Sequence, residues 1–179
     1  MWDSKLEDLS VKQDFNYFLN SNNTIKFGGI FTYHKFEPGY AHGIGEESFI
    51  SEYKVNNSNA LEEALFVSNE QKIGERLTLK YGIRFSMFNN IGKGTVYDFN
   101  NNYEVTDSTI YKSGNIYNTY TNWEPRLGAK YSLNEVSSVK MSYSRTSQYM
   151  QLAQNSSGGM PLDVWFPSSP NVKPQKSDQ

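Results

Sequence analysis

The chain has 179 residues, with 17 Lys or Arg, 19 Asp or Glu and a formal net charge of −2. This near-neutral charge, without a basic stripe, excludes a general nucleic-acid binder, because phosphate backbones are held mainly by clustered Lys and Arg. The absence of cysteine excludes disulfides and thiolate metal sites, and no apolar run reaches the roughly 18 residues of a membrane-spanning helix.

The aromatic content predicts the fold class. Aromatic residues make up 15% of the chain, including 13 Tyr and 11 Phe, although hydrophobic residues total only 37%. Tyr and Phe favour pleated surfaces, whereas Asn, Ser and Gly favour turns. We therefore expect an all-β chain with large polar loops and little helix.

Six segments are predicted to be β-strands, five of them because apolar and polar residues alternate with the period of a strand. In chain order they cover residues 11–19, 25–33, 61–68, 77–87, 127–133 and 139–143. The clearest, 77–87, has Leu, Tyr, Ile, Phe or Met at every odd position and Gly or polar residues at the even ones. Residues 61–68 (LEEALFVS) also suit a helix, but they run into a turn, and we interpret them as a strand.

Short and long connections alternate between these strands. Hairpin turns are predicted at residues 20–23, 69–74 and 134–137, each rich in Asn, Ser or Gly. Long links are predicted at about residues 38–60, 89–118 and 149–179. Loops beyond about 12 to 15 residues are uncommon in compact domains, so repeated long loops need a reason.

An outer-membrane β-barrel supplies that reason. Such barrels have short periplasmic turns, long extracellular loops and strands of about 9 to 11 residues that alternate apolar toward lipid and polar toward the lumen. The expected fold is thus an antiparallel meander of about six strands that forms part of a large barrel. Phe36, Trp123, Tyr143 and Tyr149 lie near strand ends and suit the aromatic girdles at the membrane interfaces.

Several motifs in the last third of the chain carry a family resemblance. WEPRLGAKY (residues 123–131), VKMSYSRTSQY (139–149), PLDVWFP (161–167) and KPQKSDQ (173–179) follow one another in this order. Together with KYGIRFS (80–86) and KFGG (26–29), they resemble the barrel of TonB-dependent outer-membrane receptors. The resemblance is patchy across residues 61–179 and weaker before them.

The resemblance implies a barrel of roughly 22 strands with a plugged lumen. The plug, the energy-coupling box, a signal peptide and the closing strand have no counterpart here, so we expect residues 1–179 to be a single partial domain with cut ends. The implied function is import of a scarce nutrient, such as a siderophore, cobalamin, glycan or peptide, across a Gram-negative outer membrane. The implied partners are the rest of the barrel, the plug, the TonB energy complex, membrane lipid and the small nutrient.

Four cations on the polar faces of neighbouring strands form the first candidate site: Lys80, Arg84, Arg126 and Lys130. In a barrel they would line the lumen as a basic ladder. Such a ladder could hold the plug by ion pairs or attract an anionic ligand. Ordinary solvation of the lumen is the alternative explanation.

Aromatic residues in the long links form the second candidate site: Tyr40, Tyr97, Tyr103, Tyr111, Tyr117 and Trp165. Exposed aromatics can grip a chelate, a sugar or a peptide because they bury a large area at low entropic cost. Packing of the loops against one another is the alternative explanation.

Other polar clusters do not indicate a cofactor or a reaction. The set His34, Glu37, His42, Glu46 and Glu47 and the set Asp98, Glu104 and Asp107 lack the fixed geometry of a transition-metal site and the ligand spacing of a calcium loop. Glu62 and Glu63 are adjacent in a strand and point to opposite faces, so they cannot share one acid–base site. We expect no metal, no cofactor and no enzymatic activity.

A secreted soluble β-sandwich that binds carbohydrate through its loop aromatics is the rival hypothesis. It would bury the apolar faces between two sheets. For a barrel segment taken alone, we expect self-association instead, because two open edges and an uncovered apolar face invite it.

Overall fold

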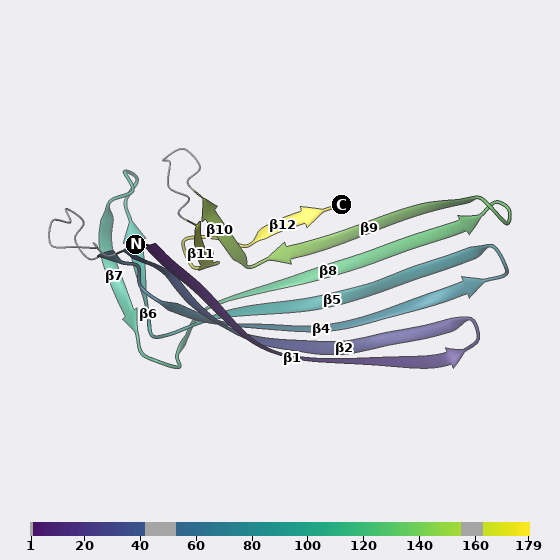
Figure 1. The fold of residues 1–179 in the computed structure, drawn as a ribbon, viewed down its shortest axis with the longest axis horizontal. Coiled ribbons are helices and arrows are strands. Elements are labelled where there is room, and N and C mark those ends of the chain that lie inside the picture. The colour runs from purple at the N-terminus through teal and green to yellow at the C-terminus, as the bar shows by residue number, and fades with distance from the viewer. Residues whose placement is uncertain (1, 42–52, 155–162) are drawn as a thin grey trace.

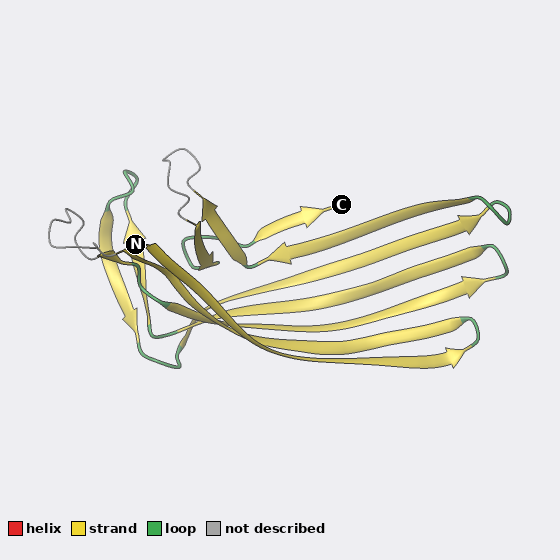
Figure 2. Cartoon of the chain, in the orientation of Figure 1, coloured by secondary structure: helices red, strands yellow, loops and turns green. Residues whose placement is uncertain are grey.

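The structure, a computed structural model, describes residues 2–41, 53–154 and 163–179. Figure 2 shows these residues as strands joined by turns. None of them forms a helix that is long and apolar enough to cross a membrane. The strands are β1 (Trp2–Asn20), β2 (Asn23–Ala41), β3 (Tyr53–Lys54), β4 (Ser58–Ile73), β5 (Leu77–Ile91), β6 (Gly94–Phe99), β7 (Val105–Tyr111), β8 (Ile116–Ser132), β9 (Ser138–Gln148), β10 (Met150–Gln154), β11 (Asp163–Pro167) and β12 (Gln175–Asp178).

The main sheet is an antiparallel meander. Its order is β1-β2-β4-β5-β8-β9-β12, and β3 pairs with β2 beside this path. Six long strands run side by side, with their tight turns at one end and the hairpins β6–β7 and β10–β11 at the other (Figure 1). The predicted all-β meander is confirmed, and β12 adds a seventh strand to its path.

The register sorts odd and even residues onto opposite faces of the sheet. Between the register shifts near the strand ends, even-numbered residues of β1 to β9 pair with even-numbered ones, as in His34 with Ala60, Arg84 with Glu124, and Lys130 with Lys140. Because side chains alternate along each strand, the even-numbered residues of these paired stretches share one face. We call this the inner face, since β11 packs against it, and the odd-numbered face the outer face.

The outer face exposes its apolar side chains. Leu9 is 71% exposed, Leu65 68% and Met141 74%, each on a different strand. Further exposed apolar residues on this face are Val11, Phe15, Tyr17, Leu19, Phe27, Phe31, Val67, Tyr81, Ile83, Trp123, Leu127, Tyr131, Val139 and Tyr143. A β-sandwich would bury such a face against a second sheet, so the rival fold is wrong.

The boundary of this exposed apolar surface on the side of the β6–β7 and β10–β11 hairpins crosses the strands obliquely. The boundary lies at Leu9 on β1 and at Tyr143 on β9. Tyr143 is level with Tyr17 of β1, because the strand pairing connects them in the order Tyr143, Leu127, Tyr81, Asn69, Ile25 and Tyr17. From β1 to β9 the boundary therefore moves by eight residues along the strands, about 26 Å, while it crosses five strand spacings, about 24 Å. A surface inclined by about 45° to its strands matches the tilt of strands in a membrane barrel.

Asn and Gly shape the short turns. Asn20 Oδ1 accepts hydrogen bonds from the Asn22 backbone N–H and from Asn23 Nδ2, each at 3.0 Å, which closes the β1–β2 turn. Asn134 Oδ1 accepts from the Val136 N–H in the β8–β9 turn. The turn predicted at residues 69–74 is wrong in position, because pairing continues to Ile73 and the chain reverses after Gly74, which has a φ of +59°.

The strands are longer than the predicted 9 to 11 residues. β1 and β2 have 19 residues each, which span about 60 Å, against an apolar band of about 25 Å in a membrane barrel. The extra length lies beyond the apolar surface, where Lys5 and Lys35 pair with Glu7 on the outer face. The long links are correspondingly shorter than predicted, and β6, β7, β10, β11 and β12 occupy parts of them.

A small core lies on the inner face, at the end of the sheet that carries the hairpins. Phe36, Ala60, Phe88 and Tyr149 are at most 2% exposed and pack together. The prediction that Phe36 and Tyr149 belong to membrane girdles is therefore wrong, because both lie inside this cluster. Trp123 and Tyr143 face outward, and their positions suit a girdle.

Candidate functional site

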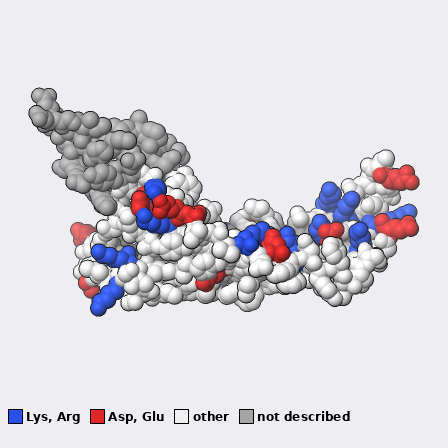
Figure 3. Space-filling model, turned by 60° about the horizontal axis from the view of Figure 1, so that its bottom comes forward, with Lys and Arg blue, Asp and Glu red and all other residues white. Residues whose placement is uncertain are grey.

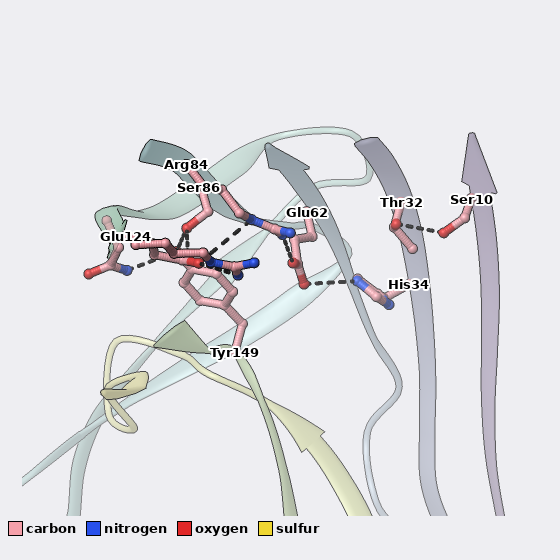
Figure 4. A network of polar contacts seen from close by, with 10 residues as sticks. Ser10, Thr32, His34, Glu62, Arg84, Ser86, Glu124 and Tyr149 are labelled. Atoms are coloured by element: carbon pink, nitrogen blue, oxygen red, sulfur yellow. Dashed lines mark hydrogen bonds and ion pairs between the residues drawn. The ribbon is translucent and has the colours of Figure 1, made fainter. Parts of the chain in front are cut away.

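A polar network crosses the inner face beneath the β10–β11 hairpin (Figure 4). It joins side chains from β1, β2, β4, β5 and β8 and ends at Tyr149, between β9 and β10. Its members are Asp8, His34, Glu62, Arg84, Ser86, Asn122, Glu124, Arg126 and Tyr149. All of them except Tyr149 are even-numbered, so the period of two brings them to one face.

His34 sits between two carboxylates. Its Nδ1 lies 2.7 Å from Asp8 Oδ1, and its Nε2 lies 3.6 Å from Glu62 Oε2. The imidazole is almost fully buried, and Nε2 has no hydrogen-bond partner within the described residues. The short hydrogen bond to Asp8 therefore orients the imidazole ring, and the Glu62 carboxylate lies just beyond hydrogen-bond range of Nε2.

Arg84 connects the two glutamates of the network. Its Nη2 lies 3.4 Å from Glu62 Oε1, and its Nε lies 3.7 Å from Glu124 Oε2. Glu124 is 3% exposed and also has Arg126 Nη2 at 4.0 Å. A buried carboxylate needs charge partners and hydrogen bonds to offset its lost hydration, and the two guanidinium groups with Ser86 supply them.

Tyr149 links this network to the hairpin. Ser86 Oγ donates to Glu124 Oε1 at 2.8 Å, so its oxygen accepts from the Tyr149 hydroxyl at 2.7 Å. Asn122 Nδ2 in turn donates to the Tyr149 hydroxyl at 2.8 Å. The phenol therefore has both a donor and an acceptor partner although it is buried.

Further hydrogen bonds fasten the chain after β11 to the inner face. Asn90 Nδ2 donates to the Ser168 carbonyl and the Tyr120 hydroxyl to the Ser169 carbonyl, each at 2.8 Å. Asn118 Nδ2 donates to Asn90 Oδ1 at 2.9 Å and orients that amide. Ser168 and Ser169 of the third long link thus lie against the inner face, where the sequence predicted only an external loop.

The four predicted lumen cations all lie on the inner face, but they do not form a purely basic ladder. Lys80 Nζ lies 2.8 Å from Glu70 Oε2, and the two arginines share Glu124. Lys130 pairs directly across the strands with Lys140. The contacts of Glu62, Glu70 and Glu124 with these cations were not predicted, because Glu62 was considered only with Glu63 and Glu70 was assigned to a turn. Their even positions on β4 and β8 place them on the same face as the cations.

The loop aromatics divide into packed and exposed groups. The rings of Tyr111 and Tyr117 stack with centroids 4.9 Å apart. Burial raises the pKa of the Tyr117 phenol, and Tyr111 adds to the shift. Tyr97 and Trp165 are partly exposed, at 38% and 36%. The side chain of Tyr40 lies outside the described residues.

Tyr103 is the most exposed of the predicted aromatics. It is 89% exposed at the tip of the β6–β7 hairpin and has a φ of +63°. Asn100 holds this tip, because its Oδ1 accepts from the N–H groups of Asn102 and Glu104 and its Nδ2 donates to the Glu104 carboxylate. The left-handed backbone that such a residue rarely adopts is thereby fixed with the ring pointing into solvent.

The acidic clusters have structural partners. Glu37 pairs with Lys35 at 2.7 Å, and hydrogen bonding to Glu37, reinforced by Glu7, raises the pKa of that ammonium. His42, Glu46 and Glu47 lie outside the described residues. Within the described part of the chain, no group of three or more His, Cys, Asp or Glu could hold a metal ion. Glu62 and Glu63 lie on opposite faces as predicted, since Glu62 contacts Arg84 and Glu63 accepts from Asn89 on the outer face.

One comparison with known proteins identifies a family. A family model described as "TonB dependent receptor-like, beta-barrel" matches residues 2–179. No curated protein and no solved structure matches the chain.

Proposed function

The chain belongs to the TonB-dependent receptor-like β-barrel family, and on that premise we propose that it forms part of the wall of a receptor that imports a scarce nutrient across a Gram-negative outer membrane. The family consists of receptors and transporters, not enzymes. The proposed ligand classes are ferric siderophores, cobalamin, glycans and peptides. The proposed partners are a plug inside the barrel and the TonB energy complex.

The two-faced sheet is the observation that carries this proposal. Its outer face exposes apolar side chains such as Leu65 and Met141, which cost free energy in water but suit hydrocarbon. Its inner face carries the ion pairs of Arg84 and Lys80. A wall between lipid and a polar lumen needs this division of side chains.

The proposed mechanism gives this segment two roles. The hairpins β6–β7 and β10–β11 supply ligand contacts through the exposed aromatic side chains of Tyr103 and Trp165. Its inner face meets the plug, and the hairpin fastened by Tyr149 narrows the lumen at the ligand-entry end. Energy coupling would act on the plug, so the wall itself holds its shape while the plug moves.

Site-directed spin labelling tests the orientation of the wall. Met141→Cys and Ser142→Cys are neighbours on β9 that face opposite sides, and each is placed in a cysteine-free background of the full receptor in outer-membrane vesicles. The label at 141 should collide mainly with dissolved oxygen, and the label at 142 mainly with a water-soluble nickel chelate. Equal access of the nickel chelate to both positions would contradict a membrane wall.

An uptake assay tests the import function. Cells that express the full receptor and cells that lack it are given radiolabelled cobalamin, a ferric siderophore, a maltodextrin or a labelled peptide. We expect receptor-dependent accumulation of one probe, and its loss when a protonophore collapses the inner-membrane potential. Accumulation that survives the protonophore would indicate passive diffusion through an open pore instead.

A further inference from the structure

The β6–β7 hairpin forms a small sheet of its own. Among the described strands, β6 and β7 pair only with each other, so each has one edge that no other strand covers. The hairpin lies at the end of the molecule opposite the tight turns (Figure 1), which is the extracellular end in the proposed receptor. An uncovered strand edge can accept another extended chain as an added strand.

The two edges of this hairpin differ. Asn171 Nδ2 donates to the Tyr97 carbonyl at 2.9 Å, so the chain between β11 and β12 meets the β6 edge. On β7, the Ser108 N–H donates to the side chain of its neighbour, Asp107 Oδ1, at 2.7 Å. Tyr97 and Ser108 are directly paired, and these contacts are those of a pair whose backbone groups point outward to the two edges. The open edge is therefore that of β7, where a peptide carbonyl could replace the Asp107 side chain as acceptor.

One face of the hairpin is apolar and exposed. The register places four apolar side chains on this face, and the residues are 38 to 73% exposed. They are Tyr97, Phe99, Val105 and Ile110. Apolar surface in contact with water costs free energy in proportion to its area, so a ligand with apolar side chains gains affinity by covering this face.

The opposite face of the hairpin is acidic. Asp98 on β6 and Asp107 on β7 pair directly across the strands, where like charges destabilise a sheet. These two residues and Glu104 are the charged residues between Lys93 and Lys112, which flank the hairpin. Acidic and basic side chains are both visible at the left-hand end of the molecule, where the hairpin lies (Figure 3). A basic ligand would relieve the repulsion between the paired carboxylates.

An extended peptide that alternates apolar and basic residues matches the edge and both faces. Successive side chains of an added strand point to opposite faces. Its apolar side chains would therefore cover Val105 and Ile110, while its basic ones would lie beside Asp107. β7 has seven residues, about 23 Å of extended chain, which sets the length of the peptide that it can pair with.

Other occupants use only part of this surface. A neutral glycan would stack on the aromatic rings but leave the backbone edge and the carboxylates without a role. A second copy of the hairpin, added edge to edge, would bring Asp107 close to another Asp107. We propose that the open edge of β7 binds a basic peptide of about seven residues by strand addition, an inference that rests on the proposed function and narrows its ligand class.

Fluorescence anisotropy with labelled peptides tests this inference. The probe is an eight-residue peptide of alternating valine and lysine, added to the full receptor in nanodiscs of phosphatidylcholine, whose neutral head groups do not attract it. We expect saturable binding, together with slower hydrogen exchange in residues 105–111. A probe that fails to bind a receptor which imports another nutrient would overturn this inference alone.

Two comparison peptides separate strand addition from adhesion through side chains. One is N-methylated on every valine and the other on every lysine, so both keep the side chains of the probe. Backbone N–H groups alternate between the two edges of a strand, and one of these peptides therefore loses the donors that face β7. That peptide should bind about tenfold more weakly or worse, while the other binds nearly as well as the probe. Equal binding by both would overturn the inference.

Receptor variants test the edge and the acidic face separately. S108P removes an N–H group from the open edge and should weaken binding of the probe, whereas its matched control, S108A, keeps that group and should not. D98N/D107N should weaken binding of the valine–lysine probe by about twofold to tenfold, but leave a valine–threonine peptide unaffected. The heat-dependent electrophoretic mobility of each variant confirms that its barrel is assembled.

Three outcomes separate failure of this inference from failure of the proposed function. Binding that S108P leaves unchanged would show that the peptide does not pair with β7. A receptor dimer that S108P separates would assign the edge to a second copy and likewise overturn the inference. Probe binding that passes all these tests, in a receptor that accumulates none of the nutrients in the uptake assay, would support the peptide site and contradict the import function.

Discussion

The ring of Tyr149 lies flat on the ring of Phe88, with centroids 4.9 Å apart and 4° between the planes. Phe88 belongs to β5 of the wall, whereas Tyr149 leads from β9 into the β10–β11 hairpin. This stack and the two hydrogen bonds of the phenol hold Tyr149, and the start of β10 that follows it, against the inner face.

Removing the Tyr149 hydroxyl should weaken the attachment of the β10–β11 hairpin to the sheet but leave the stack on Phe88 in place. Y149F keeps the stack but removes the donor to Ser86 Oγ and the acceptor of Asn122 Nδ2, while the Ser86–Glu124 hydrogen bond remains, at a cost of about 1 to 3 kcal/mol. Y149A also removes the ring and should cost more, about 3 to 5 kcal/mol. Hydrogen exchange in the full receptor should therefore speed up in β10 and β11 in the order wild type, Y149F, Y149A. Unchanged exchange in Y149A would show that the hairpin is held by other contacts.

Two inner-face glycines should respond differently to the same substitution. A Cβ at Gly82 would lie 2.7 Å from the Val67 carbonyl oxygen and 2.6 Å from Ser68 Cβ, whereas at Gly128 it meets nothing within 3.8 Å. We expect G82A to reduce the yield of folded receptor and G128A to leave it nearly unchanged. The heat-dependent electrophoretic mobility of the assembled barrel measures this yield. Equal yields would mean that β4 and β5 can separate at Gly82 without loss.

Neutralising a buried glutamate should cost more than neutralising an exposed one. Glu124 has a side chain 4% exposed beside two arginines, whereas Glu70 is 41% exposed beside Lys80. Removing one partner of a buried pair strands the other charge and can cost about 3 to 5 kcal/mol, while exposed pairs contribute about 0 to 1 kcal/mol. Urea titration of the refolded receptor should show a lower midpoint for E124Q than for E70Q. The opposite order would mean that water reaches Glu124 freely.

A charge on the outer face should impair membrane assembly more than the same charge on the inner face. Leu65 and Ser68 both lie on β4, and Leu65 is 68% exposed on the apolar side. An arginine in the hydrocarbon costs about 2 to 4 kcal/mol near the midplane, but little toward a polar lumen. L65R should therefore lower the amount of receptor in the outer membrane, and S68R should change it less. A reversed effect would invert the assignment of the two faces.

The isolated chain should self-associate in buffer. Among the described strands, β1 and β12 end the sheet order with one unpaired edge each, and the outer face leaves apolar side chains uncovered. Both features favour association. Sedimentation velocity should show oligomers that a mild detergent disperses. A stable monomer without detergent would contradict this expectation.

The sequence by itself determined which residues lie on the apolar outer face and which lie on the polar inner face. A period of two is a local property of extended backbone, so Leu79 and Lys80 must point to opposite sides whatever strand lies beside them. Residues 61–68 were correctly predicted as a strand, although on the evidence of a following turn that lies farther along the chain, after Ile73. The motifs around Trp123 indicated the family. The Asn-rich turns at residues 20–23 and 134–137 were also readable, because Asn side chains bond to nearby backbone.

Only the tertiary structure decided which inner-face residues meet and how far each strand extends. Arg84 finds Glu62 and Glu124 because the registers of β4, β5 and β8 bring them to one level, and register depends on pairing between segments far apart in the chain. Tyr149 is buried because the chain after β9 turns inward onto Phe88. The alternation of residues along the chain does not predict this inward course, because it is stabilised by contacts between residues some sixty positions apart, such as Phe88 and Tyr149.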